Sequence, residues 1–468
     1  MMRTLLKLTA AEVASLTGGR LTSGSEGTRI QSISIDSRTV EPGDLFFAIV
    51  GPRFDGHRFV DQALERGAVG AVVSQPPQPS RKDAGVLILV DDTTIALQRL
   101  AMGVRRSAPL KVVSITGSVG KTTAKEATAA ALSVRFKVLK SEGNLNNLYG
   151  LPLSILRWED EDVAVLEMGM SAPGEIARLT EIAAPDVGVV LSVAEVHLEF
   201  FASLKAIASA KGELFAGLGP GATAVVNADD PLVLEQAKRF AGHQVRFGIE
   251  EDAHLRAKDI ESTSYGLRFI VETDGDRAEV ESSLHGVHNV YNLLAALAVA
   301  RTLGVELTAA ARGLRDLQAA PHRGERFRFP DGPLVIDETY NSNPTAVRAA
   351  LASLSHEDAK RRIAVLGDML ELGERAEGLH LDCGREVAQS NVSLLVGVGP
   401  LGALIVEGAR RAGMPEAALV AARDAGEAGE ILAQRLGPGD VVLLKASRGV
   451  ALEGALSAVR RRFSGEVD

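Results

Sequence analysis

Residues 111–133 read KVVSITGSVGKTTAKEATAAALS, an apolar strand, a glycine-bearing turn and a strong helix former in that order. This order predicts a strand over Lys111–Thr116 and a helix over Lys121–Ser133, with backbone N–H groups and the start of the helix facing a phosphate chain. The full P-loop pattern G-x-x-x-x-G-K-[ST] would need a glycine where Ile115 stands, and the shorter form T-G-x-x-G-K-T is present instead. A tight strand-to-helix turn with a surface lysine is the alternative.

The turn supplies the groups that a triphosphate needs. Lys121 can reach the β- and γ-phosphates, and the hydroxyl of Thr122 can bind Mg²⁺. The residues expected to bind ATP in this loop are Gly117, Ser118, Val119, Gly120, Lys121, Thr122 and Thr123.

Apolar strands separated by helical patterns continue on both sides of this stretch. In the central part we expect strands at Val163–Met168, Val187–Val193 and Thr223–Asn227, and a helix at Asn289–Leu303. In the last part we expect strands at Leu334–Asp337, Ile363–Leu366, Leu394–Val398, Ala418–Ala421 and Val441–Leu444. Such a pattern is typical of parallel sheets covered by helices. The segment Leu255–Leu284 alternates with period two around Asp274-Gly275, which predicts an antiparallel insert.

The first part mixes short strands and helices. Strands are expected at Ile33–Ile35, Leu45–Ile49, Val69–Val73 and Val86–Val90, and helices at about Ala10–Leu16 and Phe59–Arg66. A length of 468 residues suggests about three domains, and prolines at 109 and 321 mark two joints. We expect an α/β fold with an N-terminal mixed α/β substrate domain (1–108), a central P-loop ATPase-like parallel sheet with the antiparallel insert (109–320) and a C-terminal Rossmann-like domain (321–468).

Composition excludes several classes of protein. Lys and Arg number 51 against 60 Asp and Glu, a net charge of −9, so the chain lacks the basic surface of a general nucleic-acid binder. One cysteine, Cys383, cannot form an internal disulfide, which fits a reducing compartment. The N-terminus does not read as a signal peptide, and the longest apolar runs fall far short of the ~20 residues needed to span a bilayer. We expect a soluble cytoplasmic protein.

Polar residues follow several of the expected strands, where parallel sheets bind ligands. Glu167 ends one strand and is a candidate Mg²⁺ ligand, and His197 lies past the next. Lys211, in an expected helix, would by default be a solvated lysine. Asn289 could cap the helix that it begins or, with Asn292, read a purine edge. Two carboxylates of the last part, those of Asp337 and Asp368, either contact ligands or cap helices.

Together these motifs resemble the Mur ligases, ATP-dependent enzymes that build the peptide stem of the peptidoglycan precursor. The resemblance covers nearly the whole chain. It is carried by DSR at Asp36–Arg38, FDGH at Phe54–His57, TGSVGKTT, GNLNN at Gly143–Asn147, LEMG, AEVHLE, AKGELF, HGVHNVYNLLAA, PHRGE and DETYNSNP. The central and last parts would also admit folylpolyglutamate synthases, whereas DSR and FDGH point to a UDP-muramoyl substrate.

The resemblance implies roles for residues that the pattern alone leaves open. Lys121, Lys211 and Arg323 would be catalytic, and Lys211 matches a family lysine that can be carbamylated. Asn144 would lie near the γ-phosphate, Asn292 would hold adenine, Arg323 the phosphates and Asp337 the ribose. The metal ligands would be Thr122, Glu167, His197 and Lys211. The substrate-binding residues would be Ser37, Arg38, Asp55 and His57 at the UDP end, and Asn341, Asn343, Ser447 and Arg448 at the amine end.

The implied reaction joins a carboxylate to an amine. ATP with Mg²⁺ would convert the carboxylate of UDP-N-acetylmuramoyl-tripeptide to an acyl phosphate, and D-alanyl-D-alanine would attack it. GNLNNLYGLPLSIL and DETYNSNP resemble the dipeptide-adding members; a sibling that adds the third residue would carry a D-N-P-[AR] motif, which Asn341–Pro344 does not match. A nucleotide-dependent switch protein is the rival class, but it would not need a UDP-sugar pocket. We expect a monomer with no nucleic-acid partner.

Overall fold

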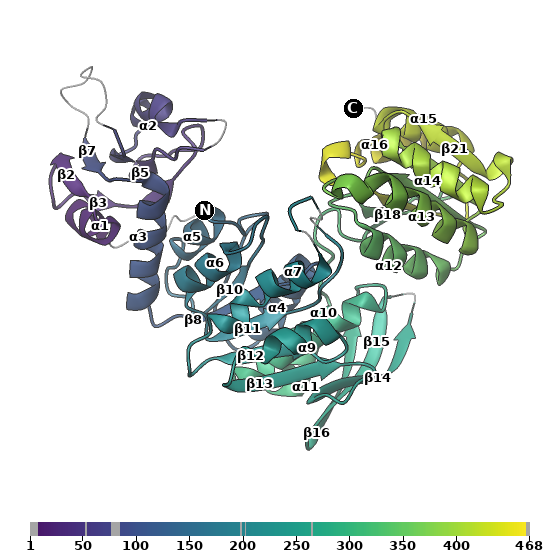
Figure 1. Ribbon diagram of the computed structural model, residues 1–468, viewed down its shortest axis with the longest axis horizontal. Coiled ribbons are helices and arrows are strands. Elements are labelled where there is room, and N and C mark those ends of the chain that lie inside the picture. The colour runs from purple at the N-terminus through teal and green to yellow at the C-terminus, as the bar shows by residue number, and fades with distance from the viewer. Residues whose placement is uncertain are drawn as a thin grey trace.

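The computed structural model describes residues 8–51, 54–75, 85–196, 199–201, 203–263 and 265–464. Within them the strands form sheets of five, nine and six strands, one in each part of the chain, and a two-stranded pair of β1 (Leu8–Thr9) with β3 (Arg29–Ile30). In Figure 1 the purple N-terminal part and the yellow-green C-terminal part lie at opposite ends, with the teal central part between them. The predicted three-part α/β fold is therefore confirmed.

The N-terminal sheet has the order β2-β7-β6-β5-β4. Its four predicted strands are present within two residues of their expected limits, whereas β2, antiparallel to β7, was not expected. The strands are β2 (Arg20–Ser23), β4 (Ser32–Ser34), β5 (Asp44–Phe47), β6 (Gly70–Val73) and β7 (Val86–Leu89). The helices include α1 (Ala10–Thr17), which Thr9 and Glu12 begin as a capping box. A 3₁₀ turn η1 (Gly56–Phe59) precedes α2 (Val60–Glu65), so the helix expected from Phe59 begins one residue later.

A long helix that the sequence analysis missed joins the first part to the second. Helix α3 (Thr93–Ser107) begins at Asp92, whose carboxylate accepts a hydrogen bond from the N–H of Ile95 at 2.9 Å. Its Gln98 Nε2 donates to the carbonyl of Leu148 at 3.2 Å, and Arg105 Nε donates to the carbonyl of Ala183 at 2.8 Å. One apolar core therefore runs from the N-terminal sheet under α3 into the central part. The domain limit at 108/109 stays a prediction.

The central sheet has the order β16-β15-β14-β13-β12-β11-β8-β10-β9. The strands from β8 to β13 are parallel: β8 (Lys111–Thr116), β9 (Val138–Lys140), β10 (Val163–Glu167), β11 (Val187–Val190), β12 (Thr223–Asn227) and β13 (His243–Gly248). The predicted insert is confirmed as an antiparallel meander, which extends the same sheet (Figure 1): β14 (Leu255–Ser262), β15 (Leu267–Thr273) and β16 (Asp276–Ser282). Gly275, with a φ of 78°, forms its turn.

Helices cover both faces of this sheet, as alternating strand residues require. Val112 of β8 joins the core shared with the N-terminal part, and its neighbour Val113 joins a second core on the opposite face. On the first face lie α5 (Gly150–Ile155), α6 (Glu175–Ala183), α7 (Leu204–Lys211), α8 (Glu213–Ala216) and α9 (Pro231–Ala237). On the second face lie α4 (Lys121–Ser133), α10 (His288–Thr302) and α11 (Leu307–Gly313).

The C-terminal sheet has the order β17-β18-β22-β19-β20-β21, and only β17 is antiparallel to its neighbour. The strands are β17 (Glu325–Arg328), β18 (Leu334–Glu338), β19 (Arg361–Gly367), β20 (Leu394–Val398), β21 (Leu419–Ala422) and β22 (Asp440–Lys445). The helices are α12 (Pro344–Ser355), α13 (Ala376–Gln389), α14 (Gly399–Arg411), α15 (Ala425–Arg435) and α16 (Gly454–Ser464), with 3₁₀ turns η2 (Gly373–Arg375), η3 (Glu416–Ala418) and η4 (Arg448–Val450). The five strands expected here are thus confirmed as a parallel sheet.

The C-terminal part reaches back to the central part near the end of β11. Arg375 Nη1 donates to Glu195 Oε1 at 2.7 Å, and the N–H of Glu199 donates to the carbonyl of Glu371 at 3.2 Å. Across the described helices, none is long and apolar enough to cross a membrane.

Candidate active site

The phosphate loop lies where β8 ends and α4 begins, as the sequence predicted. Gly120, just before the helix, has a φ of 84°, and a Cβ there would lie 2.3 Å from Asn292 Oδ1, so only glycine fits. Lys121 Nζ donates to the carbonyl of Gly117 at 3.0 Å and so folds back over the loop. Ser118 is buried and its hydroxyl accepts from the N–H of Ala194 at 2.8 Å, which ties the loop to the segment after β11.

A carboxylate faces the loop from the neighbouring strand. Glu167, 2% exposed at the end of β10, accepts a hydrogen bond from Thr122 Oγ1 at 2.8 Å through Oε2. Its other oxygen, Oε1, accepts from Asn146 Nδ2 at 2.9 Å. Gly169 makes room for this amide, since a Cβ at that position would lie 3.0 Å from Asn146 Oδ1. The carboxylate of Glu167 is therefore directed to the phosphate loop.

Asn146 is a residue that the sequence analysis passed over in favour of Asn144. Both belong to the GNLNN motif, but the side chain of Asn144 is exposed. Among the described residues only the carbonyl of Asn144 forms a hydrogen bond, accepting from the N–H of Asn146 at 2.8 Å. The placement of Asn144 near a γ-phosphate stays a prediction. Sequence alone could not choose between the two asparagines because the loop has no regular period.

Lys211 and Arg323 lie close enough to Lys121 for their charges to interact with it, and Lys121 in turn interacts with Glu167. Lys211, at the end of α7, is 2% exposed, so the default of a solvated lysine is wrong. Burial, with a smaller contribution from the Lys121 ammonium, holds the pKa of Lys211 well below its usual value. Burial also lowers the pKa of Lys121; Glu167 opposes that shift and Arg323 adds to it. Among the described residues no group forms a hydrogen bond or ion pair with the Lys211 amine. Lys121 and Arg323 are therefore the groups that offer positive charge to phosphates here, whereas the lowered pKa of Lys211 favours a neutral amine.

The start of α10 carries the predicted adenine-binding residues. Asn292, 5% exposed, donates through Nδ2 to Asn289 Oδ1 at 2.9 Å, and Asn289 Nδ2 donates to the carbonyl of His285 at 2.8 Å. Asn289 lies inside the first helical turn, so its role as an N-cap is wrong; the cap position belongs to Val287.

The C-terminal part contributes Arg323 and Asp337. The guanidinium carbon of Arg323 lies 3.7 Å from the centre of the Tyr340 ring. Asp337, 1% exposed, has Oδ2 2.8 Å from His322 Nδ1, while Thr339 Oγ1 donates to its Oδ1 at 2.6 Å. Ligand atoms of His322, Glu325 and Asp337 all lie within 4.8 Å of one another, so this group could also hold a metal ion.

The predicted amine-binding residues lie at the carboxyl ends of β18 and β22. Asn343 begins α12 by accepting from the N–H of Ala346 at 2.9 Å, and the N–H of Ser342 donates to Asn341 Oδ1 at 2.8 Å. Ser447 Oγ accepts from the N–H of Leu370 at 2.9 Å, and Arg448 pairs with Glu453 at 2.6 Å. Asp368, a candidate in the sequence, accepts from the N–H groups of Leu401 and Gly402 at 2.9 and 2.7 Å, and thus caps α14 rather than the next helix along the chain.

The residues predicted to bind the UDP end of the substrate form two small hydrogen-bond networks in the N-terminal part. Arg38 Nη2 pairs with Asp36 Oδ2 at 2.7 Å and is 81% exposed, so its guanidinium is accessible. Ser37 Oγ donates to Gln62 Oε1 at 2.8 Å.

The second network joins the FDGH motif to the end of β6. His57 Nδ1 lies 2.7 Å from Asp55 Oδ1, while its Nε2 accepts from the N–H of Ser74 at 2.9 Å. Asp55 also accepts from the N–H of His57 at 3.0 Å, so its carboxylate caps the η1 turn as well as contacting the imidazole.

The structure therefore brings together the loop residues, Glu167, Lys211, Asn292 and Arg323. It leaves the N-terminal networks in a separate sheet, at the opposite end of the molecule from the C-terminal part (Figure 1). His197, expected to bind metal, lies outside the described residues.

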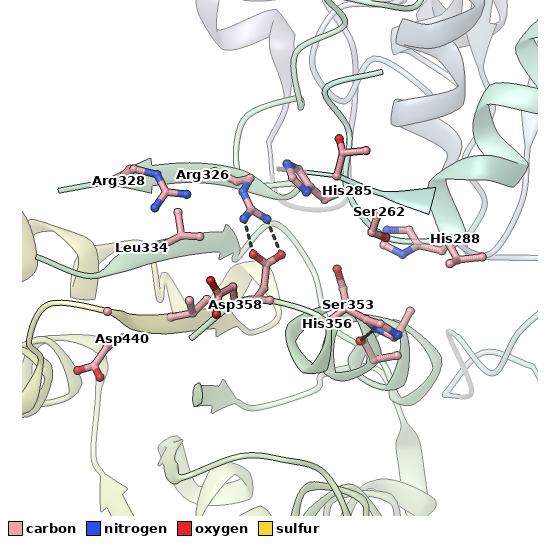
Figure 2. Close-up of a pocket in the computed structure, with 18 of the residues that line it drawn as sticks. Ser262, His285, His288, Arg326, Arg328, Leu334, Ser353, His356, Asp358 and Asp440 are labelled. Atoms are coloured by element: carbon pink, nitrogen blue, oxygen red, sulfur yellow. Dashed lines mark hydrogen bonds and ion pairs between the residues drawn. The ribbon is translucent and has the colours of Figure 1, made fainter. Parts of the chain in front are cut away.

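A cavity of about 550 Å³ lies between the central and C-terminal parts, and none of the predicted site residues lines it. Figure 2 shows His285 and His288 on one wall and Ser353 and His356 on the other, with Arg326 reaching across. Arg326 forms a two-pronged ion pair with Glu357, at 2.9 and 2.6 Å. This cavity lies at the amino end of the C-terminal sheet, beside Leu334 and Val441, and so is distinct from the phosphate site.

Three regions of the chain match domains of one known protein family. Residues 29–105 match the catalytic domain of the Mur ligase family, 115–300 the Mur ligase middle domain and 322–448 the glutamate ligase domain of Mur ligases. The UDP-N-acetylmuramoyl-tripeptide–D-alanyl-D-alanine ligase of Bacillus subtilis is 35% identical over 452 residues, which cover 96% of this chain and 97% of that protein. The protein of the same name from Escherichia coli is 36% identical over 398 residues, covering 84% of this chain and 86% of its own.

The chain belongs to the Mur ligase family.

Solved structures of Mur ligases agree with this assignment. MurF from Acinetobacter baumannii has a TM-score of 0.88 at 32% identity and covers 97% of this chain and 98% of its own. MurF from Thermotoga maritima, solved in complex with ADP, has a TM-score of 0.82 at 32% identity, covering 93% and 98%. A Mycobacterium tuberculosis folylpolyglutamate synthase shares the fold at 18% identity, with a TM-score of 0.60.

Proposed function

We propose that this Mur ligase joins D-alanyl-D-alanine to UDP-N-acetylmuramoyl-tripeptide, using ATP and releasing ADP and phosphate. The observation that carries the proposal is its similarity, over 96% of the chain, to a ligase named for that reaction. The N-terminal motifs DSR and FDGH support the UDP-linked substrate, since a nucleotide switch would not need them.

The nucleotide side of the reaction rests on the positive charges around the phosphate loop. Lys121 and Arg323 would neutralise charge that builds up on the transferred phosphoryl group. Asn292 would bind the base and Asp337 the ribose. The Thermotoga maritima relative, solved in complex with ADP, supports this use of the site.

The loop also fits a magnesium ion. The hydroxyl of Thr122 and the carboxylate of Glu167 lie 2.8 Å apart and are hard oxygen ligands of the kind that Mg²⁺ prefers. When bound, Mg²⁺ would supply positive charge next to the β- and γ-phosphates. Asn146, donating to the other oxygen of Glu167, would hold that carboxylate in place for the ion.

The acid and the amine would approach from different parts of the chain. A carboxylate is a poor electrophile, so its oxygen would first attack the γ-phosphorus to form an acyl phosphate, with ADP leaving. The dipeptide nitrogen would then attack the acyl carbon, and phosphate would leave. The UDP end would be held near Ser37, Arg38, Asp55 and His57, and the dipeptide near Asn341, Asn343, Ser447 and Arg448. We expect the enzyme to act as a cytoplasmic monomer.

A coupled assay of ADP release tests the proposal. We expect ADP only when ATP, Mg²⁺, the UDP-tripeptide and D-alanyl-D-alanine are all present. Release with the nucleotide alone, undiminished by omission of either acceptor, would favour the switch class instead.

A further inference from the structure

A buried lysine stands at the carboxyl end of β22, beside the residues expected to bind the amine. Lys445 is 4% exposed and is paired in register with Glu338 of β18. Its Nζ lies 3.1 Å from Glu338 Oε2 and donates to the carbonyl of Asn341 at 3.1 Å. Lys445 thus holds the loop that follows β18, residues 339–343, at both its start and its middle.

The residues that follow β22 tie the 339–343 loop to the loop after β19. The N–H of Ser447 donates to the carbonyl of Asp368 at 3.0 Å, and its Oγ accepts from the N–H of Leu370 at 2.9 Å. Its hydroxyl also lies 3.4 Å from the carbonyl of Ser342. The loops after β18, β19 and β22 are therefore joined into one surface at the carboxyl edge of the sheet.

The 339–343 loop also borders the nucleotide site. Tyr340 lies against Arg323, and the N–H of Tyr340 donates to the carbonyl of His322 at 3.1 Å. Across from the loop, His288 at the start of α10 lies close enough to Glu338 and Lys445 that both affect its pKa, in opposite directions. The 339–343 loop thus borders both the predicted nucleotide site and the predicted amine site.

Stability does not explain a charged pair here. Burying an ammonium and a carboxylate costs several kcal/mol of desolvation, and apolar residues of similar volume are often as stable or more so. A second ion pair on the same sheet, Arg361 with Asp440 at 2.6 Å, joins β19 and β22 at their amino ends, far along the strands from these loops. It offers a comparison on the same strand, because it joins β22 to β19 without holding a loop of the carboxyl edge; the Arg361 side chain is 45% exposed and that of Lys445 5%.

We propose that Lys445 is a positioning residue for the amine substrate. By binding the Asn341 carbonyl and Glu338, it fixes the 339–343 loop so that Asn341 and Asn343 face the incoming dipeptide while Tyr340 stays against Arg323. This inference rests on the proposed ligase reaction, whose amine it concerns.

Four variants of the full-length enzyme separate positioning from stability: Lys445→Met, the double variant Lys445→Met/Glu338→Leu, Arg361→Met and Glu338→Gln. For each we would measure the melting temperature, the KM for D-alanyl-D-alanine and the KM for the UDP-tripeptide. A misplacement of about 1 Å can cost up to about a hundredfold in rate. We therefore expect Lys445→Met to raise the dipeptide KM roughly tenfold or more and to leave the UDP-tripeptide KM within about twofold.

The double variant is the decisive one, since it leaves no unpaired charge and should fold even if Lys445→Met does not. We expect it to recover the melting temperature but keep the raised dipeptide KM, whereas Arg361→Met should lower the melting temperature with both KM values unchanged. Glu338→Gln keeps the contact of Lys445 with Asn341 and should raise the dipeptide KM less than Lys445→Met.

A dipeptide KM that returns to the parent value in the double variant would overturn the inference, because Lys445 would then be structural only. An equal rise in both KM values would overturn it as well. If the parent enzyme forms no product from these substrates, it is the proposed function that fails.

Discussion

The hydroxyl of Thr122 donates to Glu167 Oε2 at 2.8 Å, which joins the first turn of the phosphate-loop helix to the end of the neighbouring strand. The two residues lie 45 positions apart in the chain and meet because β8 and β10 are adjacent parallel strands. Parallel strands bring their carboxyl ends to one edge, and ligands bind there. The pair therefore marks the place where the phosphates and their metal ion would meet the protein.

Loss of the Lys121 ammonium should abolish most of the turnover. We expect Lys121→Ala to lower kcat by about a hundred- to a thousandfold, the usual effect of removing one preorganised contact to a transition state. Among the described residues the Lys121 side chain donates only to the Gly117 carbonyl, so the melting temperature should change little. Steady-state kinetics on the folded variant measure this, and near-parent turnover would refute the phosphate-loop assignment.

Replacement of Asn146 should weaken metal binding, and replacement of Asn144 should not. Removing a partner that orients a metal ligand commonly costs about ten- to a hundredfold in metal affinity. We expect Asn146→Ala to raise the Mg²⁺ concentration for half-maximal activity about tenfold, and to weaken Mn²⁺ binding to the ADP complex measured by electron paramagnetic resonance. Asn144→Ala, which removes an exposed side chain two residues away, is the control for the Mn²⁺ measurement, because the ADP complex carries no γ-phosphate for Asn144 to contact. Equal effects of the two variants on Mn²⁺ binding would show that the hydrogen bond from Asn146 to Glu167 does not orient the carboxylate for the metal ion.

Lys211 should react with carbon dioxide. Because its pKa is held well below the usual value, its amine is neutral over more of the working pH range and can attack CO₂, losing a proton to give a carbamate. We expect a carbamate carbon signal by ¹³C nuclear magnetic resonance in labelled bicarbonate. We further expect Lys211→Ala to lose most activity and regain part of it with short carboxylates.

The exposed Lys205 on the same helix provides the control. Lys205→Ala should keep both the carbamate signal and the activity. A fully active Lys211→Ala variant would show that the buried amine takes no part in the reaction.

His285 should make the fold sensitive to mild acid. Burial, aided by the nearby Arg326, lowers the pKa of His285 from 6.5 to about 4. Between these two values the unfolded chain binds more protons at this residue than the folded one does, so stability falls as pH falls from 6.5 to 4. Urea unfolding at several pH values should show a flatter dependence in His285→Asn. Ser353→Ala, on the opposite wall of the cavity (Figure 2), removes no titrating group and should keep the parent slope, and an unchanged slope in His285→Asn would contradict the prediction.

The order of strands and the phosphate loop were predictable because local signals coincide there. Lys111–Thr116 and Lys121–Ser133 have the same limits in the structure as in the sequence analysis, since an apolar strand, a glycine turn and an alanine-rich helix agree with one another. Helix α3 was missed because its polar residues, such as Gln98 and Arg105, serve the contact with the central part rather than solvent. Long-range packing of this kind leaves no local pattern.

The chemistry of the site was less predictable than its location. Glu167 could be chosen from its place at the end of a buried strand, but the burial of Lys211 depends on how α7 packs, and no periodicity reveals that. Asn146 and Lys445 were missed for the same reason, because each acts through a partner distant in the chain: Glu167 for the first and Glu338 for the second. Such partners appear only when the strands are placed side by side.

Mass spectrometry of the reaction product shows which substrates the enzyme joins. The purified enzyme, ATP and Mg²⁺ would be incubated with UDP-N-acetylmuramoyl-tripeptide and D-alanyl-D-alanine, and separately with UDP-N-acetylmuramoyl-dipeptide and lysine or diaminopimelate. We predict a UDP-pentapeptide in the first reaction and no product in the second. Product only in the second reaction would make the chain a ligase of the third residue, and product in neither would contradict the assignment of a ligase acting on these precursors.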